Sequence, residues 1–278
     1  MALTHKPFVI HFWGSDFDYW KSRNILILRW VLRRASSVSF ANSVLMNQAH
    51  RLWGSEVRLT ILRFGLDSLD EIDGLPEPRD SQGCPVTEDS RLTTVVVGTN
   101  SQPAQQHASI IKQLLRLPIN LQRRCRFVFP LNYGDRANRL DVLKLLSSAT
   151  FKHTVLDEMI YGAELARFRQ ATDVLIQVQL HDALSGAMLE SLYAGACVIT
   201  GSWLPYDDLR HAGVDWLEVD SVTEVGRALH SAIDRTVDTK MNRSIVASLS
   251  RWGTVADEWH RHYTLALRGE RDAGVTAT

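Results

Sequence analysis

Two acidic residues stand eight positions apart in the stretch HDALSGAMLESLYAGACVITG, residues 181–201. Asp182 falls in an expected loop and Glu190 in the second turn of an expected helix, so both carboxylates could accept hydrogen bonds from the hydroxyl groups of one ligand. The helix begins with small residues, which leave its first amide groups barely shielded. Together with the helix dipole, these amides form a seat for an anion such as a diphosphate.

The ends of this short helix are well marked in the sequence. Ser185 is a good N-cap and Gly195 stands where a left-handed C-cap is wanted. Acidic residues near a helix start also occur simply because they complement the dipole, and the motif taken alone favours that explanation. Its position after a buried strand and before another apolar strand favours a ligand site instead.

The elements that would position this motif alternate regularly between strand and helix. Apolar runs predict strands at 7–13, 37–43, 56–67, 91–100, 125–134, 152–157, 171–180 and 196–201. Helical periodicity predicts helices at 21–35, 44–53, 108–117, 139–149 and 163–171, and a mostly helical tail after 222. This alternation is typical of parallel α/β sheets, which bind ligands at the carboxyl ends of their strands.

Composition limits the kind of ligand and the location. Lysine plus arginine number 31 and aspartate plus glutamate 31, so the formal net charge of zero gives no field that would gather nucleic acid. Cys84, Cys125 and Cys197 have no paired spacing, which disfavours disulfides and zinc. No apolar run approaches a membrane span, and the first ten residues lack a signal-peptide pattern. We expect a cytoplasmic protein.

The 181–201 stretch resembles the donor-binding signature of GT-B glycosyltransferases of the family-4 type. In that signature, two glutamates separated by seven residues precede a turn of small residues and a valine-rich strand. Asp182 stands in place of the first glutamate and Glu190 keeps the second. Ser185 stands where the family usually has glycine, so the resemblance does not carry over each phosphate contact.

Other segments follow the family's order from about residue 8 to residue 230. VVVGTNSQPAQQH, residues 95–107, is similar to the first strand and loop of the donor domain, where the family clamps the diphosphate with an arginine and a lysine. This chain offers Asn100, Gln106 and His107 there. With PLNYGD at 130–135 and WGSD at 13–16, the loop more closely resembles the lipid-linked fucosamine-type (4-alpha-L-fucosyltransferase-like) transferases that extend bacterial polysaccharide units.

The resemblance implies an α/β, GT-B-like fold of two Rossmann-like domains with parallel sheets. The expected organisation is a partial N-terminal acceptor-side domain at 1–70, a linker rich in Pro, Gly, Ser and acid at 71–90, a nucleotide-sugar donor domain at 91–235 and a helical tail at 236–278. A complete Rossmann-like domain needs roughly a hundred residues or more, so the N-terminal domain is expected to be truncated.

The resemblance also implies an activity: transfer of a sugar from a nucleotide-diphosphate sugar to a glycan or lipid-linked acceptor hydroxyl, in polysaccharide or glycan biosynthesis, without metal or cofactor. The expected catalytic residues are His11, Asp16 and Asp182. The expected donor-binding residues are Gly98, Asn100, His107, Asn132, Tyr133, Ser185, Gly186, Ala187, Met188 and Glu190. Two alternatives stay open: a truncated, non-catalytic binding or partner protein, and a sugar-nucleotide epimerase.

Two of these assignments have plain structural alternatives. His11 and Asp16 could instead be a histidine satisfied by backbone and a helix cap. The stretch KSRNILILRWVLRR, residues 21–34, mixes five basic residues with Ile, Leu and Trp. That pattern is compatible with an interfacial helix on the inner face of a membrane, or with a buried amphipathic helix whose basic face is solvated.

Overall fold

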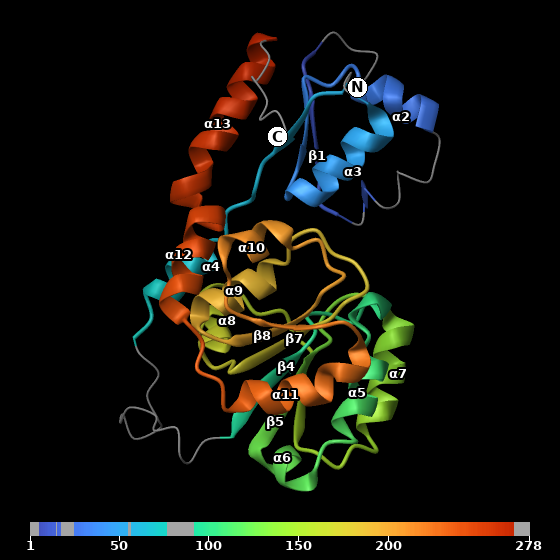
Figure 1. Cartoon of the computed structure of the whole chain (residues 1–278), viewed down its shortest axis with the longest axis vertical. Coiled ribbons are helices and arrows are strands. Elements are labelled where there is room, and N and C mark those ends of the chain that lie inside the picture. Colours follow the sequence, from blue (N-terminus) through green and yellow to red (C-terminus); the bar gives the residue numbers. More distant parts are fainter. Residues whose placement is uncertain (1–5, 15, 18–24, 55–56, 77–91, 270–278) are drawn as a thin grey trace.

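The computed structural model describes residues 6–14, 16–17, 25–54, 57–76 and 92–269, which form two α/β domains stacked along the long axis of the molecule (Figure 1). The smaller, N-terminal domain contains a parallel sheet of order β1-β2-β3, formed by Val9–Phe12, Ser37–Phe40 and Leu59–Ile61. Its helices are α2 (Ile25–Leu32) and α3 (Ser43–Trp53). Aromatic side chains fill the core between them, with Phe12 and Phe40 stacked at 5.2 Å.

The larger domain contains a six-stranded parallel sheet of order β6-β5-β4-β7-β8-β9. The strands are β4 (Thr93–Val97), β5 (Cys125–Pro130), β6 (His153–Leu156), β7 (Val174–Gln177), β8 (Cys197–Gly201) and β9 (Leu217–Val219). The chain proceeds outward from β4 in one direction and then returns to β7 on its other side. The β4–β7 boundary is therefore the topological switch point, where doubly wound sheets bind ligands.

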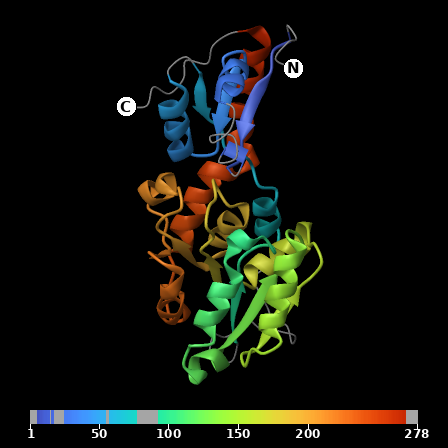
Figure 2. The same ribbon diagram turned by 90° about the vertical axis from the view of Figure 1, so that its right-hand side faces the viewer.

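Helices cover both faces of this sheet (Figures 1 and 2). They are α5 (His107–Leu114), α6 (Ile119–Arg124), α7 (Arg136–Leu146), α8 (Gly162–Gln170), α9 (Gly186–Ala194), α10 (Asp207–Ala212) and α11 (Val225–Ile233), with short 3-10 turns at Pro103–Gln105 and Val222–Glu224. Because successive strand residues face opposite sides, Val95 and Val97 join the core under α5, whereas Val96 joins the core under α9. The continuous apolar strands of the sequence are thus explained by burial on both faces.

The expected linker begins later than the sequence indicated. Residues Ser68–Asp73 form helix α4, whose Leu69 and Ile72 are buried against the larger domain. The chain has therefore joined the C-terminal core before residue 71, and the expected strand at 56–67 is reduced to Leu59–Ile61. The rest of the expected linker from 77 onward, including Cys84, lies outside the described residues.

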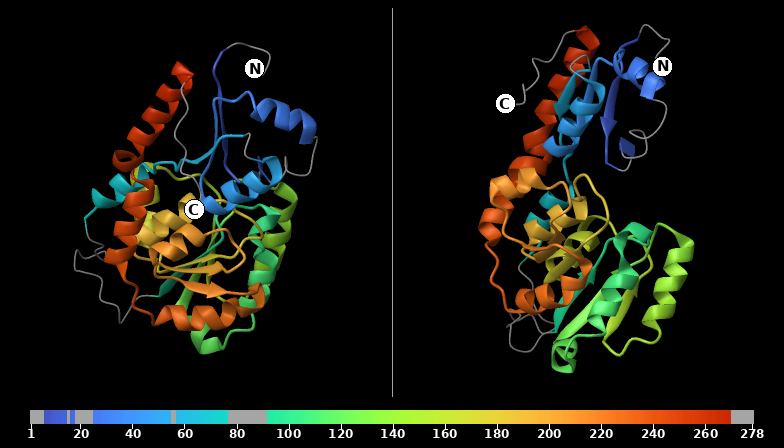
Figure 3. Two further views of the ribbon diagram at one scale, coloured as in Figure 1. Left: turned by 45° about the horizontal axis from the view of Figure 1, so that its top comes forward. Right: turned by 45° about the vertical axis from the view of Figure 1, so that its right-hand side comes forward.

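The C-terminal helices return to the smaller domain. Helix α12 (Thr239–Ser250) packs beside α9, and α13 (Trp252–Arg268) rises along the N-terminal sheet (Figures 1 and 3). The amide of Leu66 donates to the Ser250 carbonyl at 2.8 Å, and Trp259 Nε1 donates to the Arg63 carbonyl at 2.8 Å. None of the helices in the described ranges combines the length and apolar character that crossing a bilayer requires.

Candidate functional site

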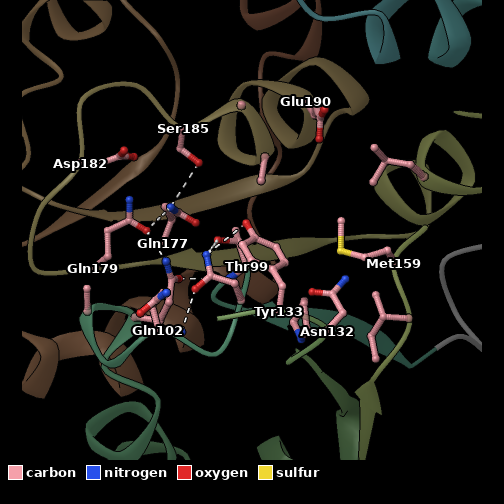
Figure 4. Close-up of a pocket in the computed structure, with 18 of the residues that line it drawn as sticks. Thr99, Gln102, Asn132, Tyr133, Met159, Gln177, Gln179, Asp182, Ser185 and Glu190 are labelled. Atoms are coloured by element: carbon pink, nitrogen blue, oxygen red, sulfur yellow. Dashed lines mark hydrogen bonds between the residues drawn. The ribbon is translucent and has the colours of Figure 1, made fainter. Parts of the chain in front are cut away.

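A cavity of about 1020 Å³ opens at the carboxyl ends of β4, β5 and β7, beside the start of α9 (Figure 4). This is the switch point of the larger sheet. Eight of the thirteen residues expected at the site line this cavity: Asn100, Asn132, Tyr133, Asp182, Ser185, Gly186, Ala187 and Glu190. The other five, His11, Asp16, Gly98, His107 and Met188, are not among its lining residues.

The leading end of α9 faces the cavity. Ser185 is the N-cap, and its Oγ accepts a hydrogen bond from the Met188 amide at 3.2 Å. The amides of Gly186 and Ala187 have no acceptor among the described residues, and both residues line the cavity. The Met188 side chain is fully buried beneath the helix and its amide is already used by the cap. The free amides of this helix start are therefore available to an anion.

Glu190 lines the same cavity but is already held by two protein groups. Its Oε1 accepts from Ser68 Oγ at 2.7 Å and its Oε2 from Arg169 Nε at 2.8 Å, and the residue is 7% exposed. The ion pair with Arg169 offsets the cost of burying the carboxylate. Each oxygen retains further acceptor capacity, so a ligand hydroxyl can still bind there.

Asp182 lies where a loop of the larger domain enters the N-terminal domain. The next residue, Ala183, is buried in the aromatic core of that domain, and its carbonyl accepts from Asn42 Nδ2 at 2.6 Å. Burial raises the pKa of Asp182, although hydrogen bonds from the Tyr206 hydroxyl, the Ala183 amide and Gln179 act in the opposite direction. Asp182 is therefore a strongly desolvated carboxyl group at the wall of the cavity.

Three glutamines that the sequence did not single out connect these parts of the site. Gln105 Oε1 accepts from the Thr99 amide at 3.1 Å, and Gln105 Nε2 donates to Gln179 Oε1 at 2.9 Å. Gln177 Nε2 donates to the same Gln179 oxygen at 2.5 Å and lies 3.3 Å from Ser185 Oγ (Figure 4). The signal available was the alternating pair of polar residues at the end of the apolar stretch VLIQVQ.

Neutral side chains line the β4–β5 side of the cavity, where the resembled family has a basic clamp. Asn100 Nδ2 donates to the Tyr133 hydroxyl at 3.2 Å, and its Oδ1 accepts from the Gln102 amide at 2.8 Å. Asn132 Nδ2 donates to the Glu158 carbonyl at 3.2 Å. This wall can offer hydrogen bonds but no fixed positive charge.

Gly98 and His107 lie behind this wall. Gly98 has a φ of +66°, and a Cβ added there would lie 2.8 Å from His107 Nε2. His107 is 1% exposed, and burial lowers its pKa to about 4. Both residues shape the turn after β4, and the structure does not bring either to the ligand cavity.

His11 and Asp16 also lie outside the cavity. The Asp16 carboxylate accepts from the amides of its own loop, at 3.0 Å from Trp13, 2.8 Å from Gly14 and 2.8 Å from Phe17. His11 Nδ1 shares a hydrogen bond with Ser39 Oγ at 2.9 Å. The pKa of His11 is lowered to about 4, mainly by burial, against the raising effect of Asp16.

The loop that carries Asp16 nevertheless reaches the site through its neighbours. Trp13 lines the cavity, and Gly14 approaches so closely that an added Cβ would lie 2.7 Å from Ala183 Cβ. Trp13 and Gly14 therefore form part of the contact between the two domains. Within the described ranges, no group of three or more His, Cys, Asp or Glu side chains is placed to hold a metal ion.

No family model matches the sequence, and no curated protein matches it. Solved structures do match its fold. Sucrose-phosphate synthase from Thermosynechococcus elongatus has a TM-score of 0.75 at 14% identity, covering 96% of this chain and 70% of that one. HepE from Anabaena in complex with UDP-glucose has a TM-score of 0.70 at 13% identity, covering 93% and 72%.

A UDP-forming alpha,alpha-trehalose-phosphate synthase from Burkholderia xenovorans has a TM-score of 0.68 at 10% identity, covering 95% of this chain and 68% of that one. At such identities the likeness concerns the fold. The chain is a GT-B-like α/β protein of two Rossmann-like domains with parallel sheets, as expected from its sequence.

Proposed function

We propose that the chain transfers a sugar from a nucleotide-diphosphate sugar to an acceptor hydroxyl. The observation that carries this proposal is the leading end of α9, where the free amides of Gly186 and Ala187 open into a cavity of about 1020 Å³ at the switch point. Such amides stabilise the charge that develops on a departing diphosphate. The HepE structures are complexes with UDP-glucose and with UDP and glucose, which supports the same ligand class here.

The two acids define which end of a bound nucleotide sugar would lie at each end of the cavity. Glu190 follows Gly186 and Ala187 on one face of the helix and would accept hydrogen bonds from ribose hydroxyls. Asp182 lies on the other side of the helix start, at the contact with the N-terminal domain, and would accept from the transferred sugar or the acceptor. In this arrangement the acceptor enters between Trp13 and Asp182, both of which line the cavity.

The finer assignment rests on resemblance. We propose a fucosamine-type, hexosyl or acetamido-sugar transferase that needs no metal and acts on a lipid-linked or glycan acceptor during surface polysaccharide synthesis, in the cytoplasm at the inner membrane face. Helix α2 supports membrane contact, because Ile27 is 64% exposed and the same short segment carries the basic residues Arg29 and Arg33.

A second candidate is a protein that binds the nucleotide sugar without transferring the sugar. The observation that favours it is the position of His11 and Asp16: neither lines the cavity, and the Asp16 carboxylate is occupied by three amides of its own loop. The two candidates share the binding site and differ in whether nucleotide is released when an acceptor is present.

The test uses Ala187→Asp, which places a carboxylate in the proposed anion seat. An acid at this position complements the helix dipole, so the fold should be kept. Calorimetric titration with UDP, GDP and dTDP should show binding to the wild type and at least a tenfold loss, about 1.4 kcal/mol, in the variant. Ala163→Asp is the matched control, because Ala163 is also the second residue of a helix, α8, but lies outside the cavity.

Absence of nucleotide binding by the wild type, or equal binding by both variants, would refute the proposed site. A transferase must also release nucleotide from a donor sugar faster when acceptor is added, with and without EDTA. Binding without such release would favour the second candidate.

A further inference from the structure

Arg169 is a cavity residue that the sequence did not indicate. It lies in the last turn of α8, is 8% exposed, and is the sole lysine or arginine among the described residues that line the cavity. Its Nε donates to Glu190 Oε2 at 2.8 Å. Neither Nη nitrogen donates a hydrogen bond to a described residue, and the guanidinium carbon lies 5.5 Å from the centre of the Phe168 ring, so the two Nη groups are left for another hydrogen-bond partner.

The place of this guanidinium follows from helix geometry. Residues three and four apart share a helix face, so Glu190 lies on the same face of α9 as Gly186 and Ala187, one turn further along the helix. Helix side chains lean toward the N-terminus, which brings the Glu190 carboxylate and the attached Arg169 toward the first turn of α9. Arg169 is therefore within the reach of a diphosphate seated on the Gly186 and Ala187 amides.

Charge balance gives Arg169 a reason to bind an anion. Asp182 and Glu190 place two carboxyl groups on the wall of the cavity, and Asn100 and its neighbours offer no fixed positive charge. A diphosphate needs a compensating cation, and a guanidinium binds phosphate oxygens in a bidentate manner.

We propose that Arg169 binds the phosphate groups of the ligand through its Nη nitrogens, while Glu190 positions it by fixing Nε. This inference rests on the proposed function, since it assumes that a diphosphate occupies the cavity. It assigns the cation of the site to α8, on the opposite side of the cavity from the loop after β4.

The test titrates inorganic pyrophosphate, which has no ribose and so does not report on any hydroxyl contact of Glu190. Arg169→Gln should lower pyrophosphate affinity by about tenfold to a hundredfold, the range for hydrogen bonds to charged groups. Glu190→Gln should bind pyrophosphate as tightly as the wild type or more tightly, because it removes a negative charge while the amide oxygen still accepts from Arg169 Nε and the amide nitrogen donates to Ser68 Oγ. Arg167→Gln, an exposed arginine on the same helix, controls for the loss of one charge.

A merely structural ion pair predicts another pattern, in which Arg169→Gln alters thermal stability and leaves pyrophosphate affinity at the wild-type value. That result would overturn the inference, as would a wild type that binds nucleoside diphosphates but not pyrophosphate. In both cases the proposed function stands. A wild type that binds neither would refute the proposed function and this inference together.

Discussion

His107 is the first residue of α5, and its imidazole is packed beneath the loop that follows β4. Burial lowers its pKa from 6.5 to about 4, partly opposed by the nearby Val97 backbone. The folded protein therefore keeps this ring neutral in mildly acidic solution, whereas the unfolded chain takes up a proton there below about pH 6.5. The free energy of unfolding must fall as the pH falls through this window.

Removing the imidazole should flatten that dependence. Between pH 7.5 and pH 5, His107 is expected to account for about 2 kcal/mol of lost stability. In His107→Gln, the difference in unfolding free energy between these pH values should be smaller by about that amount, as measured by urea denaturation. His260→Gln, on an exposed turn of α13, serves as the control for loss of a histidine. Equal pH dependence in the wild type and His107→Gln would contradict the prediction.

Some site residues could be predicted from the sequence and others could not. Ser185, Gly186 and Ala187 were predictable because a cap followed by small residues is a local pattern. Arg169 was not, since Arg167 stands two positions earlier in the same last turn of α8. Packing against Glu190, twenty-one positions away, decides which arginine faces the cavity.

Among the elements, helix α9 is fixed in length by capping residues at both ends. Ser185 caps its first turn, and Gly195, at a φ of +100°, closes its last turn with its amide directed at the Leu192 carbonyl. Without the cap, the Met188 amide would be left without a partner inside the protein. The same hydroxyl also lies 3.3 Å from Gln177 Nε2 and so links the helix to β7.

Replacement of Ser185 should show how much its N-cap hydrogen bond contributes to the stability of the protein. Ser185→Ala is expected to lower the free energy of unfolding by about 1 kcal/mol, whereas Ser185→Gly should cost only a few tenths of a kcal/mol, about what glycine costs as an N-cap. Urea denaturation of both variants measures the difference. Equal losses would show that the cap contributes little and that the Gln177 contact dominates.

The strands and long helices of the larger domain were predictable because each one shows its apolar periodicity within its own stretch of sequence. Helix α4 was not predictable from SLDEID, since its surroundings are rich in Pro, Gly and acid. Leu69 and Ile72 are buried by α8 and α9, which lie about a hundred positions later in the chain. The local sequence gives no sign of this burial. Tertiary burial here determined a helix that propensity alone did not indicate.

At the scale of the molecule, Asp208 joins the two domains. Its carboxylate accepts from the Ser43 amide at 3.0 Å, from the Ser43 hydroxyl and from Arg63 at 2.8 Å, and both partners belong to the N-terminal part of the chain. Burial tends to raise the pKa of Asp208, but the hydrogen bonds from Ser43 and the charge of Arg63 lower it overall. The ionised carboxylate is therefore the form that holds the domains together.

Asp208→Asn should weaken this contact. The variant keeps the size of the side chain but loses the charge, and we expect a free energy of unfolding lower by about 2 kcal/mol, with a lower melting temperature. Asp207→Asn is the matched control, since its ion pair with Arg210 is half exposed and such pairs contribute little. The same melting temperature for both variants would show that Asp208 does not couple the domains.

The two segments that connect the domains, one after β3 and one between α12 and α13, lie side by side along one edge of the molecule. The segment leaving β3 runs beside the junction of α12 and α13, joined by the hydrogen bond from Leu66 to Ser250 and by Trp252 packed on Gly65. Apart from these two segments of the chain, the described contacts between the domains, such as Asn42 with Ala183, are noncovalent. We expect the small domain to swing about this edge, a motion that would widen the opening between Trp13 and Asp182 without breaking the chain at the hinge.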